Sequence, residues 1–145
     1  MKRTAFGRSL FAGILSVGVL VVPSVLADHH EKSEKARFFE LRTYTTHEGK
    51  LPELHQRFRN HTNRLFVKHG MQLVGYWTPT DETKSKNTLV YMLAYPDRKS
   101  RDVAWDAFRN DPDWKKAFAD SRKNGPLVAQ VESQFLTPTH YSPLQ

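Results

Sequence analysis

Three polar side chains recur at every second position early in the chain, at Glu40, Arg42 and Tyr44. Because side chains alternate between the two faces of a β-strand, this spacing places all three on one face. A guanidinium can hold a carboxylate through two hydrogen bonds, and a phenol ring can stack on a planar ligand. The pattern therefore predicts a ligand-binding face, to which later strands would add Trp77, Tyr91, Gln130, Glu132 and Gln134.

The same residues also support a purely structural interpretation. Arg42 can pair with Glu40 or with Glu132 and fix a dimer of the protein without any ligand, because a buried guanidinium needs a carboxylate partner. The residue types leave both interpretations open.

His69 is a further candidate because it stands at the expected end of a helix, directly before Gly70. Imidazole titrates near neutral pH, so His69 could act as a general base or bind haem. Alternatively, it satisfies a free backbone carbonyl at the helix end. No two histidines of this helix stand four residues apart, so the spacing predicts no helical metal site.

A metal site is conceivable at the start of a processed chain. If cleavage follows Ala27, the new N-terminus reads Asp28-His29-His30. A free amine, two backbone nitrogens and the His30 imidazole form the square-planar set that Cu(II) and Ni(II) favour. The alternative is a disordered polar arm over residues 28–37.

The motifs of common enzymes are absent from the sequence. It contains no HExxH, CxxC or GxSxG and no glycine-rich phosphate loop. It also contains no cysteine, which excludes thiol nucleophiles and thiolate metal sites. Apart from the N-terminal metal hypothesis, we expect no cofactor.

The first 27 residues have the pattern of a signal peptide. Lys2, Arg3 and Arg8 precede an uncharged run over 10–22, which is shorter than the roughly 20 residues that span a bilayer. Val25-Leu26-Ala27 fits a cleavage site. We therefore expect an exported protein, periplasmic or secreted, that has no membrane segment once residues 1–27 are removed.

The net charge of +7 is partly contributed by the signal segment, which carries three of the cations. The remaining basic residues are spread over the chain and do not alternate with aromatic residues. This distribution predicts a solvated, mildly basic surface and no binding to nucleic acid.

Patterns of strand and helix alternate through the rest of the chain. Period-two patterns predict strands, helical periodicity and capping residues predict helices, and glycine or proline separates them. The expected strands are 38–45, 71–78, 88–95 and 127–137, and the expected helices are 51–69, 100–110 and 112–123. The order β-α-β-β-α-β predicts a ferredoxin-like α+β fold with a four-stranded antiparallel sheet and helices on one face.

The helices can cover only one face of that sheet. We expect Phe39, Leu41 and Thr43 to face them, because apolar side chains gain most from burial. Glu40, Arg42 and Tyr44 would then point to the open face, where strands 71–78 and 88–95 add bulky apolar residues. An exposed apolar face of this extent predicts a homodimer in which two sheets meet.

Six short segments stand in a characteristic order along the domain: FELRTY at 39–44, GKLP at 49–52, KHGM at 68–71, VGYW at 74–77, AWDAF at 104–108 and DPDW at 111–114. Together they resemble the NIPSNAP family, within the superfamily of dimeric α/β barrels. The resemblance covers residues 38–139 and leaves 140–145 as a C-terminal tail.

The resemblance implies a ferredoxin-like dimer. Eukaryotic members of the family are linked to mitochondria and vesicle trafficking, and bacterial members mostly lack an assigned activity. The wider superfamily includes small monooxygenases and haem-degrading enzymes. An exported single-domain member departs from the mitochondrial pattern, so trafficking roles are not carried over.

Two classes of function are therefore expected. The first is a non-catalytic dimer that binds a small molecule or a protein partner. The alternative is a cofactor-independent monooxygenase or haem-handling enzyme that uses the barrel cavity. For either class, the candidate ligand-binding residues are Glu40, Arg42, Tyr44, His69, Trp77 and Glu132.

Overall fold

The computed structural model describes residues 38–144. The expected signal segment, the polar arm at 28–37 and the metal hypothesis on Asp28, His29 and His30 lie outside the described residues.

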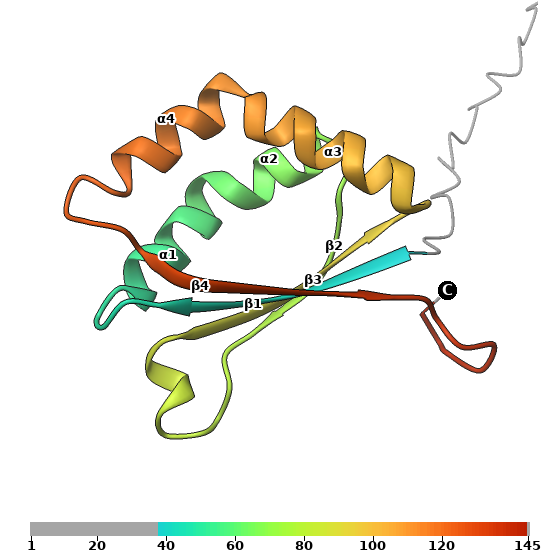
Figure 1. Ribbon diagram of the computed structural model, residues 1–145, viewed down its shortest axis with the longest axis horizontal. Helices are drawn as coiled ribbons and strands as arrows, with labels where there is room; N and C mark the ends of the chain where they lie inside the picture. Colours follow the sequence, from blue (N-terminus) through green and yellow to red (C-terminus); the bar gives the residue numbers. More distant parts are fainter. Residues whose placement is uncertain (1–37, 145) are drawn as a thin grey trace, which may run out of the picture. The chain divides into compact units, whose positions relative to one another are not determined.

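The described chain forms a four-stranded sheet and a layer of helices (Figure 1). The strands are β1 (Phe38–Thr46), β2 (Gln72–Trp77), β3 (Thr88–Tyr95) and β4 (Val128–Leu136). The helices are α1 (Leu51–Arg57), the π-helix η1 (Phe58–Thr62), α2 (Asn63–Lys68), the 3-10 turn η2 (Lys84–Lys86), α3 (Arg98–Asn110) and α4 (Pro112–Asp120).

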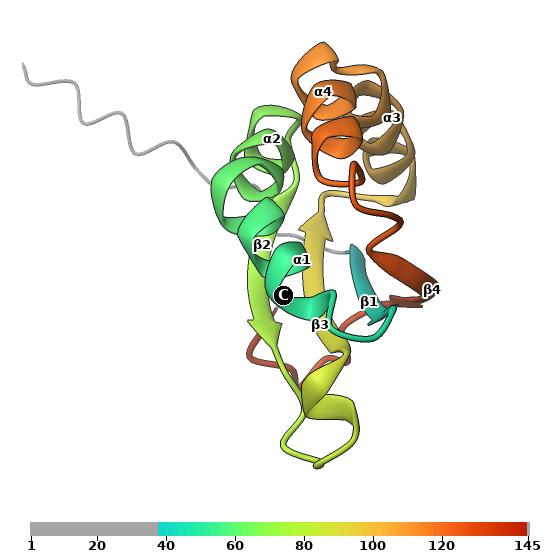
Figure 2. The ribbon, with the colours of Figure 1, turned by 90° about the vertical axis from the view of Figure 1, so that its left-hand side faces the viewer.

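The sheet has the strand order β2-β3-β1-β4, and all of its neighbouring strands are antiparallel. Helices α1 to α4 all lie on one face of it, as the two perpendicular views show (Figures 1 and 2). These observations confirm the predicted ferredoxin-like α+β fold.

The first helical segment differs from the uninterrupted helix expected over 51–69. It contains a π-helical turn at Phe58–Thr62, where the Thr62 hydroxyl donates a 3.3 Å hydrogen bond to the carbonyl of Arg57. Such turns insert one extra residue into the helix. Arg57 and Phe58 both lie buried where this turn begins.

Aspartate side chains begin both later helices. The Asp97 carboxylate accepts a 2.7 Å hydrogen bond from the backbone N–H of Ser100, so α3 starts two residues earlier than expected. Asp111 accepts one from the backbone N–H of Asp113 and begins α4, as the Asp-Pro signal predicted.

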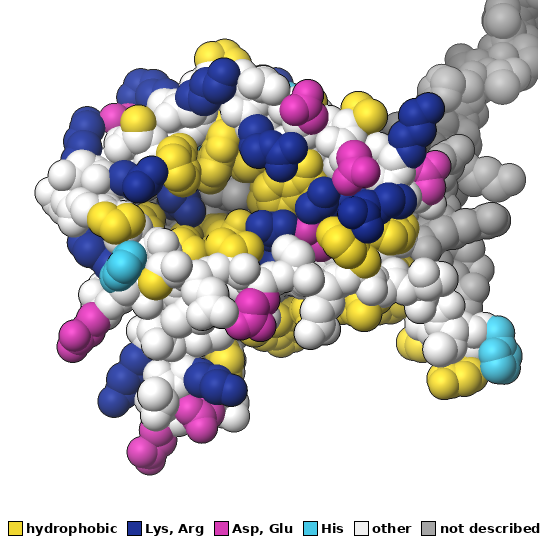
Figure 3. Space-filling view, in the orientation of Figure 1, with side chains coloured by type: hydrophobic (Ala, Val, Ile, Leu, Met, Phe, Trp, Pro, Cys, Tyr) yellow, Lys and Arg dark blue, Asp and Glu magenta, His cyan; other side chains and the backbone are white. Residues whose placement is uncertain are grey.

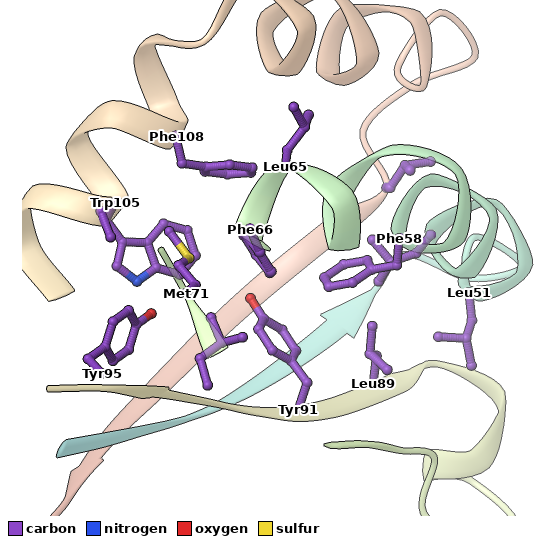
Figure 4. Close-up of a cluster of buried hydrophobic side chains, with 14 residues drawn as sticks. Leu51, Phe58, Leu65, Phe66, Met71, Leu89, Tyr91, Tyr95, Trp105 and Phe108 are labelled. Carbon is purple, nitrogen blue, oxygen red and sulfur yellow. The ribbon is translucent and has the colours of Figure 1, made fainter. Parts of the chain in front are cut away.

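The main core lies between the sheet and the helices and is rich in aromatic rings (Figure 4). Phe66 is its centre, with the rings of Phe108, Trp105, Phe58 and Tyr91 all within 6.1 Å between centroids. Tyr91 points from β3 toward the helices in Figure 4.

The predicted orientation of β1 is wrong. Glu40 is fully buried against α3, and Tyr44 packs edge-on against Phe58 in the helical layer. The residues that alternate with them, including Phe39 and Leu41, therefore point away from the helices. The inversion is physically acceptable because α3 supplies hydrogen-bond donors to Glu40, so burial of this carboxylate does not leave it unpaired.

A smaller apolar cluster lies on the sheet face opposite the helices. Phe39 and Ala94 are buried there, and Val74 and Met92 pack against them. On the same face the Trp77 indole lies over Gly75 and remains half exposed. The apolar bulk expected on this face is therefore present, but β1 contributes the alternate set of residues.

Strand β4 forms one edge of the sheet, and β1 is the only one of the described strands that pairs with it. All of its residues after Val128 are exposed, including Val131, Phe135 and Leu136. Its side toward the helices is therefore incompletely covered.

Candidate functional site

A cavity of about 290 Å³ lies between the sheet and the helices near β4, and we call it the helix-side cavity. Apolar and aromatic residues dominate its lining, which consists of Tyr44, Arg57, Phe58, Thr62, Phe66, Phe108, Trp114, Phe118, Arg122, Pro126, Leu127, Val128, Ala129 and Val131. Figure 3 shows this side of the molecule as a hollow floored by hydrophobic side chains, with Lys and Arg side chains around it.

Helices and strands together build the cavity. The π-helical turn and the end of α1 form one wall, α4 and the segment that follows it form another, and β1 with β4 form the floor. Phe66 of α2 and Phe108 of α3 complete the lining. Because β4 is incompletely covered, Val131 stands at the exposed side of the cavity.

Arg57 is the buried cation of this cavity. Its Nη1 donates a 3.2 Å hydrogen bond to the Ser121 hydroxyl, and its buried Nε has no hydrogen-bond partner. Its guanidinium lies 5.3 Å from the ring centroid of Trp114 and 5.5 Å from that of Phe118. No carboxylate among the described residues pairs with it. Burial lowers the pKa of Arg57, but a guanidinium remains charged in proteins.

Arg122 is the second cation of the lining, and it is exposed. Its guanidinium lies 4.8 Å from the ring centroid of Phe118. Among the described residues that line the cavity, none is acidic and none is histidine. The cavity therefore combines an apolar interior with uncompensated positive charge.

Arg42 differs from Arg57 because its guanidinium is paired with a carboxylate. Its Nη1 donates a 2.6 Å hydrogen bond to Oε1 of Glu40, its Nη2 donates one of 3.3 Å to the Tyr44 hydroxyl, and its guanidinium lies 4.4 Å from the ring of Trp105. Arg42 is thus paired within the chain. Of the two partners that the structural interpretation named, Glu40 is the one that it contacts.

Glu40 is the acceptor at the centre of this network. It receives two hydrogen bonds from Arg101, at 2.9 and 2.7 Å, and further ones from Trp105 and Tyr95. Burial would raise the pKa of Glu40, but hydrogen bonds from Arg101 and the charge of Arg42 outweigh it and hold the pKa below its usual range. The carboxylate is therefore ionised and its oxygens are engaged within the protein.

His69 lies away from the cavity and bonds to another helix. Its Nε2 is 2.7 Å from Oδ2 of Asp111, and Nζ of Lys68 donates to the same oxygen at 2.7 Å. The contact joins the end of α2 to the start of α4. The expected bond to a free carbonyl is thus replaced by a hydrogen bond to a helix-capping aspartate.

The six candidate ligand-binding residues do not form one site. Glu40, Arg42 and Tyr44 are together on the helix-covered face, whereas Trp77 and Glu132 lie on the opposite face. Of the six, only Tyr44 lines the helix-side cavity.

Arg57 was missed in the sequence, although a signal was present. It follows Leu54 by three residues and directly precedes Phe58, so it stands on the flank of the apolar stripe of its helix. An arginine at such a position can be buried on folding. The signal is therefore an arginine beside the apolar stripe of a helix.

The described residues lack two further features. No group of three or more His, Asp or Glu side chains is arranged to hold a metal ion. Within residues 38–144, no helix has the length and apolar character required to cross a bilayer.

Known structures share this fold along most of the chain. A NIPSNAP family protein of unknown function from Agrobacterium tumefaciens is 24% identical, with 77% of this chain and 96% of that one covered and a TM-score of 0.65. An uncharacterised NIPSNAP domain protein from Burkholderia xenovorans is 26% identical, with 73% and 98% covered and a TM-score of 0.63.

A monooxygenase from Streptomyces coelicolor, solved with the ligand nanaomycin D, is also similar in fold. It is 13% identical, with 78% of this chain and 96% of that one covered and a TM-score of 0.53, so the likeness concerns the fold alone. No curated protein shows significant sequence similarity to the chain. The sequence matches the NIPSNAP family over residues 39–143, and the chain therefore belongs to that family.

Proposed function

We propose that this NIPSNAP protein binds a small organic molecule in the helix-side cavity. The observation that supports the proposal is the lining, which is mostly aromatic and aliphatic with a few polar groups. Small-molecule sites in proteins typically have this composition and a volume of about 300–1,000 Å³. The volume of about 290 Å³ is just below that range and fits a compact ligand.

The lining favours binding over catalysis. Its titratable side chains are Tyr44, Arg57 and Arg122, and the described part of the cavity offers neither the carboxylate nor the imidazole that most often transfers protons in enzymes. The monooxygenase of this fold was solved with an organic ligand, so the fold can accommodate one. The likeness supplies no catalytic residue for this chain.

Blocking the exposed side of the cavity tests the proposal. Val131 lines the cavity, whereas the neighbouring Gln130 points to the other face of β4. Val131→Trp should fill the opening, and Gln130→Trp adds the same ring outside it. The probes are 2-naphthoate and 2-naphthamide, which share one ring system, and binding is measured by calorimetry and by the shift of the Trp114 indole resonance in NMR.

At least one probe should bind to the wild type and to Gln130→Trp, and binding should be lost in Val131→Trp. If neither probe binds to the wild type, or if Val131→Trp binds as well as Gln130→Trp, the proposed function fails.

The quaternary structure is a separate part of the proposal. The face opposite the helices exposes Trp77 and Leu136 beside the buried cluster around Phe39, which supports a homodimer formed through this face. Sedimentation equilibrium at micromolar concentration should give twice the monomer mass. A monomer under these conditions would contradict the dimer.

We also propose that the protein is exported, since the first 27 residues have the pattern of a signal peptide. The intact mass of protein taken from outside the cytoplasm should correspond to a chain that begins at Asp28. A mass that includes residues 1–27 would contradict cleavage at this position.

A further inference from the structure

We infer that the ligand of the helix-side cavity is an aromatic carboxylate and that Arg57 binds its carboxylate group. The inference rests on the proposed function, because it names the class of molecule for the same cavity. Its evidence is separate, since it depends on the electrostatics of one buried side chain and not on the shape of the cavity.

The first step is the missing counter-charge. Three arginines come close to the core from the helix-covered side, and two of them, Arg42 and Arg101, share the carboxylate of Glu40. Arg57 is the most buried of the three, and it pairs with no carboxylate among the described residues. A buried charge is normally paired, because removing it from water is costly.

The second step is the unused hydrogen-bonding capacity of Arg57. A guanidinium has five N–H donors. Within residues 38–144, Ser121 accepts the one hydrogen bond that the Arg57 side chain donates. The rings of Trp114 and Phe118 stabilise the cation through their faces, but they accept no hydrogen bond in the plane of the fork. A carboxylate supplies both a negative charge and acceptors that match this fork.

The third step concerns the rest of the ligand. Phe58, Trp114 and Phe118 line the cavity beside Arg57, so the body of the ligand contacts aromatic surface. Flat rings pack favourably on such side chains. Arg122 is exposed beside Phe118 and adds a second positive charge, which favours the entry of an anion.

A pair of matched probes tests this class directly on the wild-type protein. 2-Naphthoate and 2-naphthamide have the same ring and nearly the same shape, but only the first is charged at pH 7. The carboxylate should bind at least about tenfold more tightly, since hydrogen bonds to charged groups contribute more than neutral ones. Equal affinities would overturn the inference and leave the proposed function intact.

The Arg57→Met variant tests the assigned residue. It should lose the preference for 2-naphthoate and keep its affinity for 2-naphthamide. Arg109→Met is the matched control, because Arg109 is exposed on α3 and lies outside the cavity, and it should keep the preference. A tenfold preference that survives in Arg57→Met would overturn the assignment to Arg57.

A folding defect in Arg57→Met would leave the matched probes on the wild type as the deciding measurement. NMR of the wild-type protein then shows where the carboxylate binds. 2-Naphthoate should shift the Arg57 Nε resonance, and 2-naphthamide should leave it nearly unchanged. A shift with the amide and none with the carboxylate would overturn the inference.

Discussion

The indole Nε1 of Trp105 donates a 2.7 Å hydrogen bond to Oε2 of Glu40, across the boundary between α3 and the sheet. This bond belongs to a network in which two arginines neutralise one fully buried carboxylate. The network orients β1 so that Glu40, and with it Arg42 and Tyr44, points toward the helices.

Replacing Glu40 should destabilise the protein strongly. Glu40→Gln leaves Arg42 and Arg101 without their shared carboxylate, and breaking a buried ion pair in this way typically costs about 3–5 kcal/mol. Urea unfolding should show a loss of this order. Glu53→Gln is the control, since Glu53 forms a partly exposed pair with Lys50 that should contribute less than about 1 kcal/mol. Equal losses in the two variants would mean that the network does not hold β1.

The two buried arginines should respond differently to replacement. Arg42→Met removes a partner of buried Glu40 and should lower the free energy of unfolding by about 1–3 kcal/mol. Arg57→Met removes a buried cation that pairs with no carboxylate of residues 38–144, so the free energy of unfolding of the ligand-free protein should fall by less than about 1 kcal/mol or rise. Both variants are compared by urea unfolding without ligand, and a larger loss for Arg57→Met would reverse the assignment of roles.

The contact between α2 and α4 should make stability depend on pH. Hydrogen bonds from Lys68 and His69 hold the pKa of Asp111 well below its usual range. Because the folded-state pKa is lower than the unfolded-state value of about 3.9, the ionised carboxylate stabilises the fold above that pH. This contribution is lost as the pH falls toward the folded-state pKa.

Asp111→Asn keeps the helix cap but removes the charge. The variant should be less stable than the wild type at pH 6, and the difference should shrink as unfolding is measured at successively lower pH below 4. Asp97→Asn is a useful comparison, since Asp97 caps α3 through Ser100 without an ion pair among the described residues. A constant difference between Asp111→Asn and the wild type would contradict the ion-pair explanation.

Gly75 should tolerate no side chain while Trp77 keeps its position. A Cβ at residue 75 would stand 2.7 Å from the far edge of the Trp77 indole. The backbone of Gly75 does not have a positive φ, so the conflict involves the side chain alone. Gly75→Ala should therefore displace the indole, which is detected as a change in Trp77 fluorescence, and under the dimer proposal it should weaken dimerisation.

A double-mutant cycle isolates this contact. In a Trp77→Leu background, Gly75→Ala should cost less stability than in the wild type, because the indole is gone. If the cost is the same in both backgrounds, the close approach of Trp77 to Gly75 is not what excludes the methyl group.

The secondary structure was largely predictable because its signals are local. The bounds of β3 were predicted correctly, since Asn87 and Pro96 bracket a continuous apolar run. Gly70 marks the end of α2 with a φ of +80°, as the stop signal indicated. The π-helical turn was not predicted, because its residues fit an ordinary helix equally well.

The faces of β1 were not predictable from the strand alone. Both sets of alternating residues are at least partly buried in this fold, since Tyr44 packs against the main core and Phe39 belongs to the cluster on the opposite face. The prediction that Phe39 and Leu41 face the helices would be correct if α3 offered only apolar side chains. Arg101 and Trp105 instead provide the donors that make burial of Glu40 favourable, and this pairing joins positions 61 and 65 residues apart in the chain.

The edge position of β4 has a consequence for the behaviour of the protein in concentrated solution. A strand that pairs on one side only leaves its outer backbone groups free to pair with another molecule. Over Val128–Leu136 the strand has no proline and no lysine, and Glu132 is its only charged residue. Segments of this composition are prone to intermolecular β-pairing when they carry no charge. We therefore expect Glu132 to oppose such pairing by like-charge repulsion, and Glu132→Val should favour aggregation through this edge.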